Sequence, residues 1–342
     1  MRRLLGFLLK AAISGFLLYF AFRRVNFIPL GQRLDKIEYH WLVVAILIFI
    51  TQTTLGALRW QTIVNQCNPL GFPSFTTSVA LRYTFIAAFF NQTLPSTVGG
   101  DAVRIWQLAR DQGNWRTATY SVLIDRLTGV LVLASLVILC LPWSFALISD
   151  ATGRIALVTL GVGSVSACLV FFSLGFVHWR WLDRLWLTRQ LAAAASMARR
   201  VFGALSSGPL IIVYSLLIHA LSVTAAWGLA KAVAAPLNWS QALLLVLPVL
   251  LIATIPLSIA GWGTRESAMV LAFGYAGLPE SDGLIVSILL GVAMFAVGVF
   301  GGVVWILGRG KRNSDEALVL GQESRAPPAK KRRPKRPSLS SD

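Results

Sequence analysis

Six long apolar runs constrain the fold of this chain more than any other feature. Each has about the 20 mostly apolar residues that a helix needs to cross a bilayer. They are Leu4–Phe22, Trp41–Leu58, Ala118–Leu147, Ile155–Val177, Leu210–Ala235 and Gly283–Gly308. Only 13% of the 342 residues are charged, whereas soluble domains carry about 25%. The sequence therefore excludes a single water-soluble globule and predicts an all-α polytopic membrane protein.

Two further apolar stretches end in helix-breaking residues. Thr76–Leu94 leads into Pro95 and a Gly-Gly pair, and Ala242–Ile255 leads into Pro256 and a Gly-rich segment. Six full spans put both termini on one side, so each broken stretch must enter and leave the membrane on the same face. We therefore predict about six full transmembrane helices plus two re-entrant hairpins.

The basic residues orient the chain, because cytoplasmic loops are enriched in Lys and Arg. The segment 178–208 has five arginines against one acid, so we expect it to be cytoplasmic. The expected location is a bacterial inner membrane, crossed several times, with both termini cytoplasmic. The basic loop that contains Arg23 and Arg24 fits this orientation poorly, since alternation puts it outside.

The domain boundaries follow from the same pattern. We expect a membrane domain over residues 1–308 and a disordered, basic cytoplasmic tail over 309–342, which supplies part of the net charge of +17. A basic block can bind nucleic acid. Beside a membrane helix, contact with anionic lipid is favoured, and we expect no nucleic-acid partner.

An internal repeat relates the two broken stretches. Thr93-Leu94-Pro95 is matched by Thr254-Ile255-Pro256 at an offset of 161 residues, and each proline is followed nine residues later by an arginine, Arg104 or Arg265. The halves would span about 1–147 and 155–308. An odd number of full spans in each half makes the copies inverted, a pattern of many secondary transporters.

The first broken stretch supplies the first set of candidate substrate-binding residues. They are Asn91, Pro95, Ser96, Gly99, Gly100, Asp101 and Arg104. Pro and paired Gly free backbone groups that only protein or a water-filled cavity can satisfy at membrane depth. Asp101 and Arg104 share a helix face and can pair, and a guanidinium suits a phosphate. The alternative is a cytoplasmic loop with a solvated ion pair.

The second broken stretch supplies a matching set. Its members are Pro256, Ser258, Gly261, Gly263, Arg265 and Glu266. Adjacent residues point about 100° apart on a helix. We therefore expect either Arg265 or Glu266 to bind ligand while the other pairs across to the first hairpin. The alternative is a capped turn at the membrane surface.

Asp125 and Arg126 complete the candidate site. They lie about two turns into a predicted span, and charges inside a membrane usually face a cavity or a partner. An interfacial structural pair is the alternative, and the sequence leaves both open.

Four other residue patterns favour structural roles. Arg59-Trp60 ends a predicted span, and we expect it to anchor the helix at the inner face. His219 is expected to be a hydrogen-bonded packing residue. Gly298 and Gly302 form a G-x-x-x-G pattern typical of helix packing. The three cysteines lack metal-type spacing and are expected to pack as small apolar residues.

Several enzyme signatures are missing from the sequence. It contains no H-E-x-x-H, no P-loop, no G-x-S-x-G and only three histidines. We expect no cofactor and no metal, and we identify no catalytic residue. A transporter is therefore favoured over an enzyme.

These motifs together resemble the flippase-like membrane domain family of the lysylphosphatidylglycerol synthases. The resemblance extends over roughly 5–308. It is carried by Arg59-Trp60, Phe90-Asn91, Leu94-Pro95, Gly99-Gly100-Asp101, Arg104, Asp125-Arg126-Leu127-Thr128-Gly129, Pro256 and Gly261-Trp262-Gly263-Thr264-Arg265-Glu266.

The resemblance implies a domain that moves, or helps to move, a phospholipid or lipid-linked head group between leaflets. In aminoacyl-lipid members this domain is fused to a soluble aminoacyltransferase, which the present sequence lacks, so we do not expect lysyl transfer. Arg104 and Arg265 would receive a lipid phosphate. Asp101 and Glu266 would hold these arginines or bind a cationic head group.

The expected partners are membrane lipids, above all anionic phospholipid. A second copy of the chain or a lipid-modifying synthase is a further candidate. Two alternative functions remain open. One is a membrane-embedded enzyme acting on a lipid phosphate or lipid-linked sugar, with Asp101 or Glu266 as acid or base. The other is a scaffold whose basic tail recruits a synthase.

Overall fold

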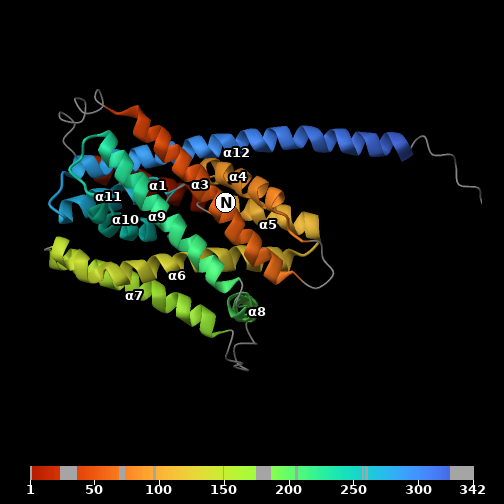
Figure 1. The fold of residues 1–342 in the computed structure, drawn as a ribbon, viewed down its shortest axis with the longest axis horizontal. Coiled ribbons are helices and arrows are strands. Elements are labelled where there is room, and N and C mark those ends of the chain that lie inside the picture. Colours follow the sequence, from red (N-terminus) through yellow and green to blue (C-terminus); the bar gives the residue numbers. More distant parts are fainter. Residues whose placement is uncertain are drawn as a thin grey trace, which may run out of the picture.

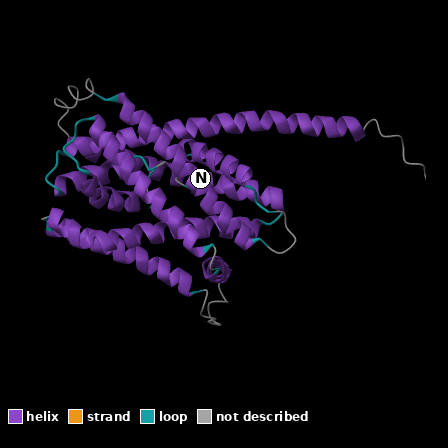
Figure 2. Cartoon of the chain, in the orientation of Figure 1, coloured by secondary structure: helices purple, strands orange, loops and turns teal. Residues whose placement is uncertain are grey.

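The structure is a computed structural model that describes residues 2–23, 37–68, 74–94, 98–148, 150–174, 186–204, 207–255, 258 and 261–323. For 2–11, 186–187 and 309–323 only the backbone is described. The described residues form eleven helices and no strand, as Figure 2 shows. The predicted all-α fold is confirmed.

Six long helices correspond to the six predicted spans. They are α1 (Arg2–Arg23), α3 (Tyr39–Cys67), α6 (Trp115–Leu147), α7 (Ala151–Ser173), α9 (Gly208–Ala232) and α12 (Glu280–Glu323). All of them except α1 contain a segment long and apolar enough to cross a membrane, and the apolar part of α1 whose side chains are described is shorter. The chain is therefore a multi-pass membrane protein.

The two broken stretches each form a pair of short helices that pack together. The first pair is α4 (Thr77–Thr93) with α5 (Gly99–Gln112), and the second is α10 (Trp239–Ala253) with α11 (Thr264–Tyr275). Pro95, Ser96 and Pro256 lie outside the described residues. The helix breaks occur where proline and glycine predicted them.

The contacts between helices follow the predicted repeat. The repeat pairs α3 with α9, α4 with α10, α5 with α11 and α6 with α12. Helix α4 packs on α12, and its counterpart α10 packs on α6. Helix α5 contacts α6, its counterpart α11 contacts α12, and α3 packs on its own counterpart α9. In Figure 1 the pair α4–α5 and the pair α10–α11 lie toward opposite ends of the bundle. This arrangement is the one expected of two inverted halves.

Close approach of α12 to α4 depends on glycines. A Cβ atom on Gly298 would lie 3.1 Å from Cγ of Gln92, and one on Gly302 would lie 2.9 Å from Cδ2 of Phe89. A Cβ on Gly301 would meet the carbonyl oxygen of Phe85 at 1.9 Å. The predicted packing role of Gly298 and Gly302 is confirmed, and α12 thereby closes one wall of the interior.

Helix α8 (Trp186–Gly203) crosses the ends of the long helices and is seen nearly end-on in Figure 1. It buries Ala194 and Ala198 and exposes Arg189, Arg199 and Arg200. Such two-sided helices are typical of membrane–water interfaces. It lies in the basic segment that the sequence assigns to the cytoplasmic surface.

Helix α12 continues beyond the expected end of the membrane domain. It reaches Glu323, whereas the sequence predicted a tail without structure from residue 309. A helix can continue because 309–323 contains no proline. Residues 324–342, with most of the basic block, lie outside the described residues.

Candidate functional site

Five charged side chains from the three helices α3, α5 and α6 form an alternating chain of ion pairs inside the bundle. Their order is Arg59, Asp125, Arg104, Asp101 and Arg126. Three positive charges face two negative charges, so the cluster carries one net positive charge. We call these five residues the charged cluster.

Asp125 accepts hydrogen bonds from two arginines. Nε of Arg59 donates to its Oδ1 at 2.8 Å, and Nη2 of Arg104 donates to its Oδ2 at 3.0 Å. Asp125 is 3% exposed. A carboxylate this deeply buried needs such partners, because removal from water is costly for a charge.

Asp101 binds Arg126 through both carboxylate oxygens. Nε of Arg126 donates to Oδ2 at 2.6 Å and Nη2 donates to Oδ1 at 3.0 Å. The predicted pair between Asp101 and Arg104 is present at 3.6 Å between Oδ1 and Nη1. The Arg126 side chain is 50% exposed, while that of Asp101 is 7% exposed. Arg126 is therefore the accessible end of the charged cluster.

Arg104 occupies the middle of the cluster. Its guanidinium lies 4.1 Å from the centroid of the Trp60 ring, and the Trp60 indole N–H donates to Oγ of Ser121 at 3.3 Å. Such a cation–π contact is stronger when it is removed from water. The Nε atom of Arg104 is buried and has no hydrogen-bond partner among the described residues.

The expectation for Arg59-Trp60 is wrong. Arg59 is 8% exposed and Trp60 is fully buried, so neither anchors a helix at the interface. Helix α3 continues to Cys67, about two turns past Arg59, and Arg59 Nη1 donates to Oγ of Ser215 on α9 at 3.0 Å. Arg59 is thus a site residue that the sequence reasoning missed, because its partners Asp125 and Ser215 are distant in the sequence.

Asp125 and Arg126 on α6 could, from the sequence, be either a pair at the membrane surface or residues that face a cavity or other partners. Asp125 and Arg126 are neighbours, yet they bind different partners from different helices. They are not a surface pair.

His219 on α9 has the structural role that the sequence predicted. Its Nε2 lies 3.1 Å from the carbonyl oxygen of Gly129. His219 is a hydrogen-bonded packing residue, as predicted.

The glycine pair at the start of α5 fixes the position of Asp101. A Cβ atom on Gly100 would lie 2.2 Å from the carbonyl oxygen of Ala87, and the Gly100 N–H donates to Oδ1 of Asn91 at 2.8 Å. Asn91 therefore ties α5 to α4. Asp101 falls in the first turn of α5, where the helix dipole favours a carboxylate.

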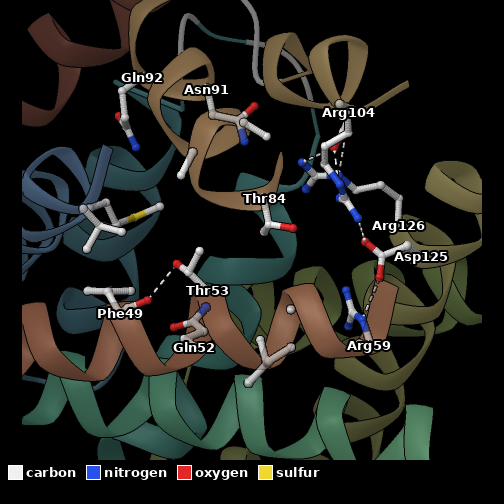
Figure 3. Close-up of a pocket in the computed structure, with 17 residues that line it drawn as sticks. Phe49, Gln52, Thr53, Arg59, Thr84, Asn91, Gln92, Arg104, Asp125 and Arg126 are labelled. Carbon is white, nitrogen blue, oxygen red and sulfur yellow. Dashed lines mark hydrogen bonds and ion pairs between the residues drawn. The ribbon is translucent and has the colours of Figure 1, made fainter. Parts of the chain in front are cut away.

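A cavity of about 240 Å³ opens beside the charged cluster. Figure 3 shows arginines and Asp125 on one side and neutral polar side chains around the rest. The neutral polar group consists of Gln52, Thr53, Thr84, Asn91 and Gln92. The cavity thus has a cationic end and a neutral hydrogen-bonding end.

The second motif forms a closed cluster of its own. Nη2 of Arg265 donates to Oε1 of Glu266 at 2.7 Å, Nε of Arg265 donates to Oγ of Ser287 at 3.1 Å, and Ser287 donates to Glu266 at 3.1 Å. The expectation that one of the two charges pairs across to the first hairpin is wrong. A long arginine side chain spans the angle between adjacent positions, so Arg265 and Glu266 bind each other.

Glycines make the turn before α11 possible. Gly261 has φ +82° and Gly263 has φ +94°, which other residues rarely adopt. The Gly263 N–H donates to Oε2 of Glu266 at 2.7 Å, and Oγ of Ser258 lies 2.8 Å from Oγ1 of Thr264. The turn therefore caps the helix and holds Glu266 in place.

Met294 separates the two motifs. Its sulfur accepts from Nη1 of Arg265 at 3.5 Å, and its side chain lines the cavity. Neither Arg265 nor Glu266 is among the described residues that line it. Of the fifteen candidate residues, the structure brings Asn91, Asp101, Arg104, Asp125 and Arg126 to the cavity wall.

Fold and site together define a multi-pass helical membrane protein with a charged cavity inside the bundle. Residues 7–302 match the family model described as the lysylphosphatidylglycerol synthase TM region. The chain therefore belongs to this family, which relates the protein to lipid modification. Neither a curated protein nor a solved structure matches the chain.

Proposed function

We propose that the protein moves a phospholipid or lipid-linked head group between the leaflets of a bacterial inner membrane. The observation that carries this proposal is the charged cluster beside the cavity. Asp125 lies about 15 Å along α6 from Trp115. At such depth charged groups are costly and commonly mark a transport pathway.

The charge balance of the cluster favours an anionic ligand. Three arginines and two aspartates leave one positive charge uncompensated. The phosphate of a lipid would neutralise it. Arg126 is the candidate for first contact, because it is half-exposed and a guanidinium offers two parallel N–H donors to a phosphate.

The size of the cavity favours a head group over a whole lipid. Its volume of about 240 Å³ is below the roughly 300–1,000 Å³ of sites for drug-sized ligands. The acyl chains would stay in the bilayer while the head group occupies the cavity. This division avoids dehydrating the phosphate in hydrocarbon.

The contacts suggest how the head group would be exchanged. Arg126 would release Asp101 when it binds the phosphate, and Asp101 would keep its contact with Arg104. Arg59 and Arg104 hold Asp125 and so position the cluster. Arg265 and Glu266 would stabilise the second hairpin, against which the first half rocks in an alternating-access cycle.

A leaflet-sidedness assay in proteoliposomes tests the proposal. Acyl-labelled phospholipids are reconstituted with the protein, and the label in the outer leaflet is quenched over time. We expect lipid movement that Arg126→Ala reduces at least about tenfold. Arg116→Ala is the matched control, because Arg116 is an exposed arginine on the same helix. Equal movement by wild type and Arg126→Ala would contradict the proposal.

The same sample also tests the enzyme alternative, which is a candidate because the family is related to lipid modification. Mass spectrometry of the vesicle lipids before and after incubation separates the two functions. Transport leaves every lipid mass unchanged and alters only its sidedness. A new lipid mass that depends on Asp101 would favour the enzyme.

A further inference from the structure

We infer that the transported head group is a phosphate diester whose outer part is neutral and bears hydroxyl groups, and that amine-bearing head groups are disfavoured. This inference rests on the proposed function and names the substrate class. The evidence for it is that some polar atoms around the cavity already have hydrogen-bond partners whereas others have none among the described residues.

Every oxygen of the two acidic groups in the cavity wall already accepts a hydrogen bond from an arginine. Asp101 and Asp125 are the only acids among the described residues that line it. Both oxygens of Asp101 bind Arg126, and the two oxygens of Asp125 bind Arg59 and Arg104 respectively. An incoming ammonium would have to displace an arginine from a wall that is already positive, and like charges repel.

The neutral side of the cavity, in contrast, has unused hydrogen-bonding atoms. Oε1 of Gln52 and Oγ1 of Thr84 are buried and have no hydrogen-bond partner among the described residues. Leaving such atoms unpaired is unfavourable. A hydroxyl group can donate to the Gln52 oxygen and can donate to or accept from the Thr84 hydroxyl.

The geometry places these two chemistries in different parts of the cavity. In Figure 3 Arg104 and Arg126 lie on one side, Gln52 lies on the other side, and Thr84 lies between them. A phosphate held at Arg126 would direct the rest of the head group toward the neutral side. A glycerol or sugar hydroxyl would be satisfied there, whereas an ammonium would be desolvated without a counter-charge.

Thr53 provides an internal comparison for Thr84. Both threonines line the cavity, but Oγ1 of Thr53 already donates to the carbonyl oxygen of Phe49 at 2.7 Å. Of these two threonines, Thr84 is therefore the one whose hydroxyl hydrogen is still available to donate to a ligand. Replacing Thr84 by valine changes the shape of the cavity little and tests the hydrogen bond of its hydroxyl.

The first experiment compares head groups in the proteoliposome assay. Phosphatidylglycerol, phosphatidylethanolamine and lysyl-phosphatidylglycerol with identical labelled acyl chains are measured separately. We expect phosphatidylglycerol to move at least about tenfold faster than either amine-bearing lipid. We also expect Thr84→Val to slow it about threefold to tenfold, as the loss of one hydrogen bond predicts. Thr51→Val removes an exposed hydroxyl that bonds only its own helix and does not line the cavity, and we expect it to leave the rate unchanged.

The outcomes separate this inference from the proposed function. If all three lipids move equally fast, or if an amine-bearing lipid moves fastest, the inference is wrong and lipid transport stands. If no lipid moves, both are wrong. Release of trapped, water-soluble glycerophosphoglycerol would identify a soluble substrate and would also overturn both.

A charge substitution provides an independent test. Gln52→Glu adds an unpaired carboxylate at the neutral end of the cavity. We expect it to raise the rate for lysyl-phosphatidylglycerol relative to phosphatidylglycerol at least about tenfold. An unchanged ratio in a variant that elutes as folded protein would contradict the inference. Gln241→Glu, at the exposed start of α10, is the control for added charge.

Discussion

The two broken-helix hairpins contain the same arginine at the same place, yet they form opposite kinds of site. The 161-residue offset that relates Arg104 to Arg265 also relates Arg126 to Ser287. In the first half Arg126 binds Asp101, and in the second half Ser287 binds Glu266. The helix after each hairpin thus contributes one polar side chain to the acid of that hairpin.

The identity of that side chain decides whether the cluster is open or closed. With serine, the second cluster has one positive and one negative charge, and Glu266 is fully buried. With arginine, the first cluster has an extra positive charge and a half-exposed guanidinium beside a cavity. A repeated backbone pattern can therefore provide a structural ion pair in one half and a ligand site in the other.

Breaking the closed cluster is expected to have the largest effect on stability. Glu266→Ala leaves Arg265 buried without its carboxylate partner, and removal of one member of a buried pair typically costs about 3–5 kcal/mol. Thermal unfolding in detergent measures the loss. The double variant Arg265→Met/Glu266→Ala removes both charges and should recover most of it. An unchanged midpoint for Glu266→Ala would show that the pair is not a structural element.

Displacing the first hairpin is expected to have the next largest effect. Gly100→Ala places a methyl group 2.2 Å from the Ala87 carbonyl oxygen, so α5 must move away from α4. Overpacking of this kind typically costs about 1–3 kcal/mol. Gly163→Ala on α7 is the control, since nothing lies within 4 Å of the added atom. If both variants unfold at the wild-type temperature, the packing of α5 on α4 does not depend on Gly100.

Removing the serine of the closed cluster should have a moderate effect. Ser287→Ala deletes the hydroxyl that bonds both Arg265 and Glu266, and one hydrogen bond contributes about 1 kcal/mol. Ser173→Ala deletes an exposed hydroxyl that bonds only its own helix and should be silent. Equal unfolding midpoints for the two variants would contradict the assigned role of Ser287.

Replacing Arg126 in the charged cluster should change the stability of the protein least. The Arg126 side chain is half-exposed, and the buried Asp101 keeps its contact with Arg104 when Arg126 is replaced. Solvent screens the half-exposed partner, and ion pairs that are screened in this way contribute about 0–1 kcal/mol. Arg126→Gln should therefore lower the free energy of unfolding by less than about 1 kcal/mol while it slows lipid movement. A loss as large as that of Glu266→Ala would mean that Arg126 is structural, and the contrast between the halves would disappear.

Much of the fold was predictable because its causes are local in the sequence. Apolar length identifies a span, and proline and glycine break α4–α5 and α10–α11 where they occur. Packing roles for Gly298 and His219 were also predictable, because small residues and isolated polar residues in spans have few alternatives. The pairing of Asp101 with Arg104 followed from helical spacing.

The sequence alone thus determined the membrane class, the broken helices and the residue types near the cavity. Apart from the pair of Asp101 and Arg104, only the tertiary structure decided which charges meet. Arg59 and Asp125 are 66 residues apart in sequence, and Arg126 turns away from its neighbour to bind Asp101. Arginine side chains are long and flexible, so helix position does not fix their partners. The packing of α3, α5 and α6 leaves Arg126 exposed and buries Arg59, and no local pattern contains that information.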